Sequence, residues 1–292
     1  MDWRALGPRI STKLPLGALR SAYARSDIIA LDLDQCIFPG YSQTALGERI
    51  AWRLLRRPAG PGERRLLPRL CLGGARLALS EAKRCLGFPT AASRLMAWYE
   101  RAMRGVPERY FAEAARELPA RSYPFAAETV ALLAEQACTG IVTLGLDVVA
   151  RAYVEAFQPA EGQGLGFFDS NVVAFREGAR GVRVFHRYAP EHLMASGEDK
   201  RRALERRMAA RGATVPTTIG HSEDDVPLAR LAAERGGLAV GFNPAPRLWE
   251  AFDAVVTGRD WEAMYALAAI LSGAQGSRAH AGAVTDLRGW TH

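Results

Sequence analysis

The stretch Ile28 to Gly40 reads IIALDLDQCIFPG, and it decides the fold. Its apolar run Ile28–Leu31 predicts a buried parallel strand, because strands covered on both faces read as continuous apolar sequence. The run ends in two carboxylates, Asp32 and Asp34. Ligands of open α/β sheets bind at the carboxyl ends of strands, so we interpret the pair as part of a site. Neighbouring carboxylates repel each other and favour a cation, a shared proton or separate chemical roles.

The composition of the 292-residue chain is that of an ordinary globular protein, with 49% hydrophobic and 24% charged residues. The net charge of +7 comes largely from dispersed arginines, which predict a solvated basic surface, and no nucleic-acid recognition motif accompanies them. The four cysteines form no CxxC pair, which argues against a zinc site or a disulfide framework. Neither a secretory signal nor a run of ~18 apolar residues is present, so we expect a cytoplasmic protein.

Strand and helix patterns alternate along most of the chain, which predicts an α/β fold. We expect residues 1–40 and 121–272 to form a Rossmann-like, mainly parallel sheet with helices on both faces. Residues 41–120, rich in Leu, Ala and Arg, predict only helices and therefore an all-helical cap domain, inserted after the first core strand and above the site. Residues 171–185 predict a β-hairpin, and residues 273–292 a flexible tail.

Two further segments carry polar groups near predicted strand or helix ends. Thr143 ends a short strand, where its hydroxyl and the free N–H groups of the next helix can hold phosphate oxygens, although threonine in this position is usually structural. Lys200 stands at the start of a helix and offers a compact positive charge. Its neighbours Arg201 and Arg202 favour a surface position when the segment is taken alone.

The loop Gly220–Pro227 is the second strong signal. It follows a predicted strand and holds three consecutive acids, Glu223, Asp224 and Asp225, more than a helix N-cap requires. Carboxylate oxygens near Asp32 and Asp34 would suit magnesium.

In this order and spacing, Asp32-Leu33-Asp34, Thr143, Lys200 and the acidic loop resemble the haloacid-dehalogenase-like (HAD) superfamily. The helical insertion is similar to the C1-type cap of that superfamily, and the predicted hairpin resembles its phosphoserine-phosphatase-like branch. The resemblance implies a metal-dependent phosphatase that hydrolyses a phosphomonoester of a small metabolite. An alternative within the same chemistry is a phosphotransferase that passes the phosphoryl group to an alcohol.

The resemblance also implies roles for individual residues. Asp32 would be the nucleophile that forms an aspartyl-phosphate, and Asp34 the general acid and base. Thr143 and Lys200 would hold the phosphoryl group. The cofactor would be Mg²⁺, with Mn²⁺ as the alternative, bound by Asp32, by the backbone carbonyl of Asp34 and by an acid of the last loop, Asp224 or Asp225.

His221 departs from the family pattern, in which the last loop commonly reads Gly-Asp-Ser-x-x-Asp. His221 stands at the first Asp and Asp225 at the second. Magnesium prefers oxygen to an imidazole nitrogen. Four interpretations follow: Asp224 or Asp225 takes over the metal, the metal affinity falls, the site prefers manganese or another metal, or the chain is a catalytically degenerate regulatory or binding protein.

The expected partner is a small phosphorylated substrate. The Leu-rich, basic stretch 66–86 would also suit contact with a membrane surface, but amphipathic core helices show the same pattern and are the preferred interpretation.

Overall fold

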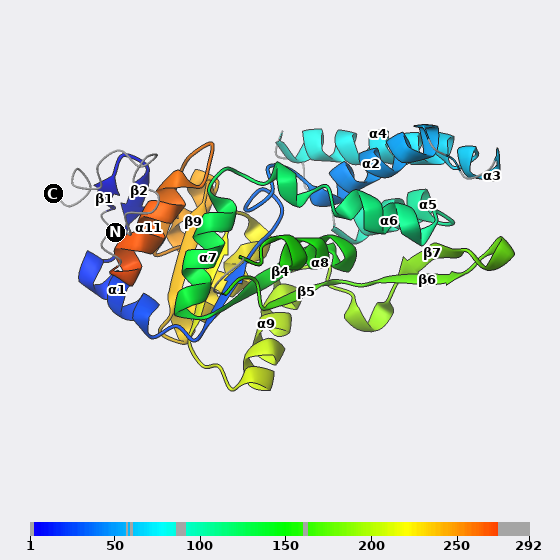
Figure 1. Ribbon diagram of the computed structural model, residues 1–292. Coiled ribbons are helices and arrows are strands. Elements are labelled where there is room, and N and C mark those ends of the chain that lie inside the picture. The colour runs from blue at the N-terminus through cyan, green and yellow to red at the C-terminus, as the bar shows by residue number, and fades with distance from the viewer. Residues whose placement is uncertain (1–2, 57, 59–60, 86–91, 160–162, 274–292) are drawn as a thin grey trace.

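The computed structural model of the chain describes residues 3–56, 58, 61–85, 92–159 and 163–273 (Figure 1). Within these residues an eight-stranded sheet forms the centre of the fold. In spatial order its strands are β1 (Arg4–Gly7), β2 (Ile10–Thr12), β10 (Ala254–Val256), β9 (Leu238–Phe242), β8 (Pro216–Gly220), β3 (Ile28–Leu31), β4 (Cys138–Leu146) and β5 (Phe167–Asn171). The strands from β10 to β5 are parallel, and β1 and β2 add an antiparallel edge.

Helices cover both faces of this sheet, as the sequence predicts. One face carries α1 (Leu16–Ala24), α7 (Ala126–Gln136) and α11 (Glu262–Ser272), and the other carries α9 (Gly197–Arg211) and α10 (Val226–Glu234) (Figure 1). Strand β3 shows why its sequence is apolar throughout. Ile29 and Leu31 join one hydrophobic cluster, whereas Ile28 and Ala30 join the cluster on the opposite face. The predicted fold class is therefore confirmed.

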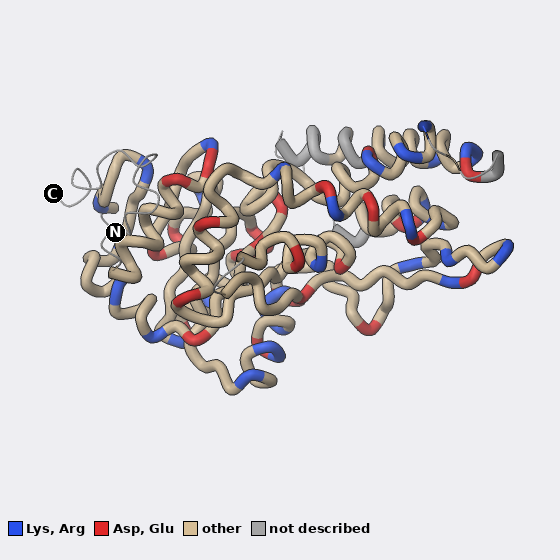
Figure 2. The backbone as a smooth tube through the Cα atoms, in the orientation of Figure 1, with Lys and Arg blue, Asp and Glu red and all other residues tan. Residues whose placement is uncertain are grey.

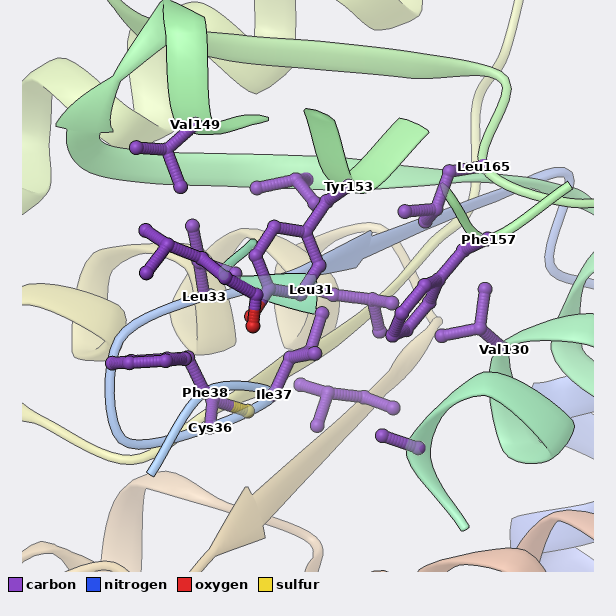
Figure 3. Packing of buried hydrophobic residues seen from close by; sticks show 14 of the residues in the cluster. Leu31, Leu33, Cys36, Ile37, Phe38, Val130, Val149, Tyr153, Phe157 and Leu165 are labelled. Carbon is purple, nitrogen blue, oxygen red and sulfur yellow. The ribbon is translucent and has the colours of Figure 1, made fainter. Parts of the chain in front are cut away.

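The loop after β3 is held by its own apolar residues. Leu33 and Ile37 pack beside Tyr153 and Phe157 from α8 (Asp147–Ala156) and its C-terminal end (Figure 3). The backbone carbonyl of Cys36 accepts a hydrogen bond from the indole N–H of Trp261 at 2.7 Å. These buried contacts fix the backbone between and beyond the two aspartates, so the carboxylates are placed by packing around them.

Helices occupy the chain between β3 and α7, at the upper right of Figure 1. They are α2 (Ser42–Arg56), α3 (Pro61–Arg64), α4 (Leu67–Cys85), α5 (Ala92–Met103) and α6 (Glu108–Ala115). The chain also contains the predicted hairpin, β6 (Val173–Glu177) paired antiparallel with β7 (Arg183–Tyr188). This hairpin stays outside the large sheet and packs beneath α5 and α6, where Phe111 stacks on Phe185 at a centroid distance of 5.5 Å (Figure 1).

Among the described helices, none combines the length and apolar character needed to cross a bilayer. The tail predicted at 273–292 lies, apart from Gly273, outside the described residues.

Candidate active site

The two aspartates of the first motif lie at the carboxyl end of β3. Asp32 extends the parallel pairing by one residue, since its N–H donates to the carbonyl of Ile219 at 2.9 Å, and its side chain is buried. Asp34 is partly buried, and its Oδ1 accepts a hydrogen bond from the backbone N–H of Ser42 at 2.8 Å. Burial, helped by the negative charge of Asp32, raises the pKa of Asp34 to about 6. Asp34 can therefore exchange a proton near neutral pH.

Lys200 lies in the first turn of α9, whose N-cap Ser196 accepts a hydrogen bond from the N–H of Asp199 at 3.2 Å. Its side chain leaves the helix inward, and only 1% of the residue is exposed. The Nζ atom donates to Oδ1 of Asp32 at 2.8 Å and also to Oδ1 of Asp225. Burial alone would lower the pKa of Lys200, but the two carboxylates outweigh burial and raise it, so the ammonium stays charged.

Asp225 is the buried anchor of the last loop. Its Oδ2 accepts hydrogen bonds from the N–H groups of His221 and Ser222 at 2.9 and 3.0 Å and from the Ser222 hydroxyl at 3.0 Å. Burial opposes ionisation, but the charge of Lys200 and these donors lower the pKa of Asp225. Gly220 permits the arrangement, because a Cβ there would lie 2.4 Å from Cβ of Asp225.

His221 turns its ring toward the first motif. Its Nδ1 lies 3.1 Å from Oδ2 of Asp32 and 3.5 Å from Oδ2 of Asp225. Burial would lower the pKa of His221, yet hydrogen bonding to Asp32 and the charges of both carboxylates give a net increase. Ligand atoms of Asp32, His221 and Asp225 lie within 4.8 Å of one another, so this group could hold a metal ion.

Thr143 stands on β4, next to β3 in the sheet. It is 1% exposed, and its Oγ1 accepts a hydrogen bond from the N–H of Gly145 at 3.0 Å. This hydrogen bond lies near the end of β4, where the pairing with β5 shifts register between Val142 and Leu146, just before α8 begins.

One cavity of about 120 Å³ connects these groups. Asp32, Asp34, Thr143, Lys200, His221 and Asp224 all line it, whereas Asp225 lies behind Lys200 and does not. Residues that sequence reasoning did not identify complete the lining. Tyr41, Gln43 and Thr44 come from the start of α2, Leu95 and Met96 from α5, Leu144 from β4 and Ser222 from the loop after β8. Gln43 ties α2 to the sheet, because its Nε2 donates to the carbonyl of Leu144 at 3.0 Å.

Tyr41, Gln43 and Thr44 follow closely after the first motif in the sequence. This proximity is the one feature from which their place in the cavity lining could have been predicted. Leu95 and Met96 carry no such signal, since apolar residues of α5 are typical of a helix core.

Comparison with known proteins identifies the class. The family model of the haloacid dehalogenase-like hydrolases matches residues 29–230, which include every predicted site residue. The chain belongs to this family. The comparison with curated protein sequences gives no match.

Solved structures of the same fold include several hydrolases. A HAD family hydrolase of Salmonella enterica matches with a TM-score of 0.55 and 14% identity, over 86% of this chain and 72% of that one. A phosphoserine phosphatase, solved as a phospho-aspartyl intermediate analogue, matches with a TM-score of 0.56 and 17% identity, over 82% of this chain and 97% of that one. The cytosolic 5'-nucleotidase IIIB bound to cytidine matches with a TM-score of 0.58 and 10% identity, over 91% of this chain and 95% of that one. The resemblance to the phosphoserine-phosphatase-like branch is confirmed at the level of fold.

Proposed function

We propose that the chain is a metal-dependent phosphatase that hydrolyses a small phosphomonoester through an aspartyl-phosphate on Asp32. The observation that carries this proposal is the contact of Lys200 with Asp32, in a cavity that also contains Asp34. The ammonium pairs with the Asp32 carboxylate at 2.8 Å and fixes one of its oxygens. A carboxylate oriented by a cationic partner, beside a second carboxyl group whose pKa is raised to about 6, is what a two-step displacement requires.

In the first step an Asp32 oxygen bonds to phosphorus while the ester P–O bond breaks, and Asp34 gives its proton to the departing oxygen. In the second step water attacks phosphorus, Asp34 takes the water proton, and the bond from phosphorus to Asp32 breaks to release phosphate. Lys200 and the Thr143 hydroxyl line the same cavity and hold the phosphoryl oxygens.

The residues around the cavity fit a divalent ion, but with a mixed donor set. Asp32 supplies oxygen and His221 supplies a ring nitrogen, and the Asp34 carbonyl and Asp224 complete the candidate ligands. Asp225 fits less well, because Lys200, His221 and Ser222 already donate to both of its oxygens. A bound ion would offset the charge of the phosphate group. Because magnesium prefers oxygen alone, we expect Mn²⁺ to bind more tightly than Mg²⁺.

The helices over residues 41–120 act in this proposal as a cap that selects the substrate. Tyr41, Gln43 and Thr44 approach the cavity from the start of α2, and Leu95 and Met96 approach it from α5. Their mixture of hydroxyl, amide and apolar groups suits a small metabolite with a polar and an apolar part.

The proposal is tested by a screen of phosphorylated metabolites with Mn²⁺ and Mg²⁺, run beside the Asp32→Asn variant. Asp32→Asn should abolish turnover of every substrate found. Asp260→Asn is the matched control, since Asp260 pairs with Arg9 at a partly exposed position away from the cavity, and should keep full activity. A surviving rate in Asp32→Asn would reject Asp32 as the nucleophile.

His221 favours a second candidate, a binding protein that retains the fold without turnover. Calorimetric titration with Mn²⁺ and Mg²⁺ separates the two candidates. Absence of metal binding, together with absence of hydrolysis of aryl phosphates, would support the binding protein.

A further inference from the structure

Large apolar side chains are unevenly distributed over the surface of the described residues. Six of them are exposed, and four of these lie on the packed helices α2 and α4: Trp52 (47%), Leu55 (56%), Leu72 (55%) and Leu79 (58%). Buried residues hold both helices from the other side, since Ile50 and Leu54 of α2 and Leu70 of α4 belong to the main hydrophobic cluster. The exposed apolar groups are therefore additional to those that the fold requires.

The outer face of α4 has a regular pattern. Pro68, Leu72, Ala75 and Leu79 follow the i, i+4, i+7, i+11 spacing that places side chains on one helical face, and all four are exposed. The opposite face packs on α5, where Gly73 lies so close that a Cβ there would be 2.4 Å from Cβ of Ala102. The helix thus presents one apolar stripe inward and a second stripe outward.

Positive charge surrounds the outer stripe. From Arg64 to Ser80 the sequence contains four arginines and no acid. Arg64, Arg65 and Arg76 are exposed, and in Figure 2 the basic segments of this region lie along the upper right edge of the molecule, where α4 is located. On α2 the guanidinium of Arg56 lies over the exposed ring of Trp52, 3.9 Å from its centroid.

We propose that the outer face of α4, together with Trp52 and Leu55 of α2, docks on an anionic phospholipid surface. Apolar side chains flanked by arginines match the two layers of such a surface, the acyl boundary and the negative headgroups. An amphipathic indole ring suits the interface between them. Four half-exposed side chains supply roughly 400 Å² of apolar surface, about half of the ~800 Å² per partner that a stable protein–protein interface buries. A second copy of the chain is therefore the weaker candidate.

The test uses the full-length protein and flotation with two kinds of vesicle, phosphatidylcholine alone and phosphatidylcholine containing phosphatidylglycerol. The wild-type protein should float with the anionic vesicles at low salt and much less in their absence. Leu72→Gln combined with Leu79→Gln should reduce the bound fraction at least about tenfold. The matched control is Leu193→Gln, which changes a leucine outside these helices that is 47% exposed, and this variant should bind as wild type.

Two further measurements complete the test. Arg65→Glu combined with Arg76→Glu should also reduce anionic-vesicle binding, and high salt should do the same to the wild type. Circular dichroism and hydrolysis of an aryl phosphate should be unchanged in the Leu72/Leu79 variant, because neither residue lines the cavity. Failure of the wild type to float would overturn the proposal. Flotation of the Leu72/Leu79 variant to the same extent as the wild type would also overturn it. A third contrary result would be a wild-type dimer that is lost in the Leu72/Leu79 variant, if that variant still binds vesicles.

Discussion

Replacing Lys200 with methionine should lower the free energy of unfolding by about 3–5 kcal/mol, the cost of leaving buried charges without a partner. Methionine nearly matches the lysine chain in length, so the change removes the charge without opening a large void. Asp32 and Asp225 are 4% and 1% exposed, and each has an oxygen that accepts a hydrogen bond from Lys200. A protonated His221 would compensate part of the lost charge, so the lower end of the range is expected.

The measurement is urea unfolding followed by circular dichroism, in a chelator so that bound metal does not contribute. Arg9→Met is the matched control, because it breaks an exposed ion pair with Asp260 and should cost only about 0–1 kcal/mol. Adding Asp225→Asn to Lys200→Met removes one of the two stranded carboxylates. The double variant should therefore lose less stability than the sum of the single variants. A Lys200→Met cost within about 1 kcal/mol of zero, or strict additivity, would refute the reasoning.

The pH dependence gives a signature that a packing defect would not produce. In the wild type the pKa of Asp225 is lower in the folded state than in the unfolded state. Its contribution to the free energy of unfolding is therefore complete at pH values above the unfolded-state pKa of about 3.9. This contribution is lost as the pH falls through the folded-state pKa. Without Lys200, Asp225 loses the positive charge that most lowers its pKa, so the pKa of Asp225 rises. The deficit of the variant should then be greatest near neutral pH and shrink as pH falls and Asp225 takes up a proton. A deficit that is constant between pH 7 and 5 would indicate lost packing instead.

Three further predictions concern the site. Because the pKa of Asp34 is raised to about 6, kcat/KM for a substrate with a poor leaving group should fall as pH rises above that value, and Asp34→Asn should remove this limb of the pH–rate profile. His221→Asp should tighten Mg²⁺ binding by at least about tenfold in calorimetry, and an unchanged affinity would exclude position 221 as a ligand. Gly220→Ala should cost about 1–3 kcal/mol of stability through its clash with Asp225, whereas Gly74→Ala, which meets open space on α4, should be neutral or stabilising in the same thermal melts.

The parts of the fold that sequence predicts are those with a strong local pattern. The apolar run of β3 reflects burial on both faces, and the insertion after it reads as helical throughout. β1 and β2 are only four and three residues long, so they show no periodicity, and they are strands because β10 pairs with β2. β5 has no strand pattern either, since three of the five residues in its sequence FFDSN are polar, and its pairing with β4 decides its conformation.

The same distinction applies to the site. Asp32 and Asp34 are visible because carboxylates at the end of an apolar strand are chemically unusual. Lys200 looks like a surface residue next to Arg201 and Arg202, and only the packing of α9 against the sheet buries it. Its two hydrogen-bond partners are 168 and 25 residues away in the chain, a relation that no local pattern encodes.

The charges around His221 suggest why a histidine is compatible with an intact site. Asp32 and Asp225 contribute two negative charges and Lys200 one positive charge, and the four groups balance when His221 is protonated. With aspartate at position 221 the same four positions would carry three negative charges and one positive, and a divalent cation would be needed to balance them. The raised pKa of His221 follows from this arrangement, because the two carboxylates favour the imidazolium. The histidine therefore makes the folded geometry of the site less dependent on a metal ion. Chelator should therefore lower the melting temperature of His221→Asp more than that of the wild type, and an equal decrease in both would contradict this reasoning.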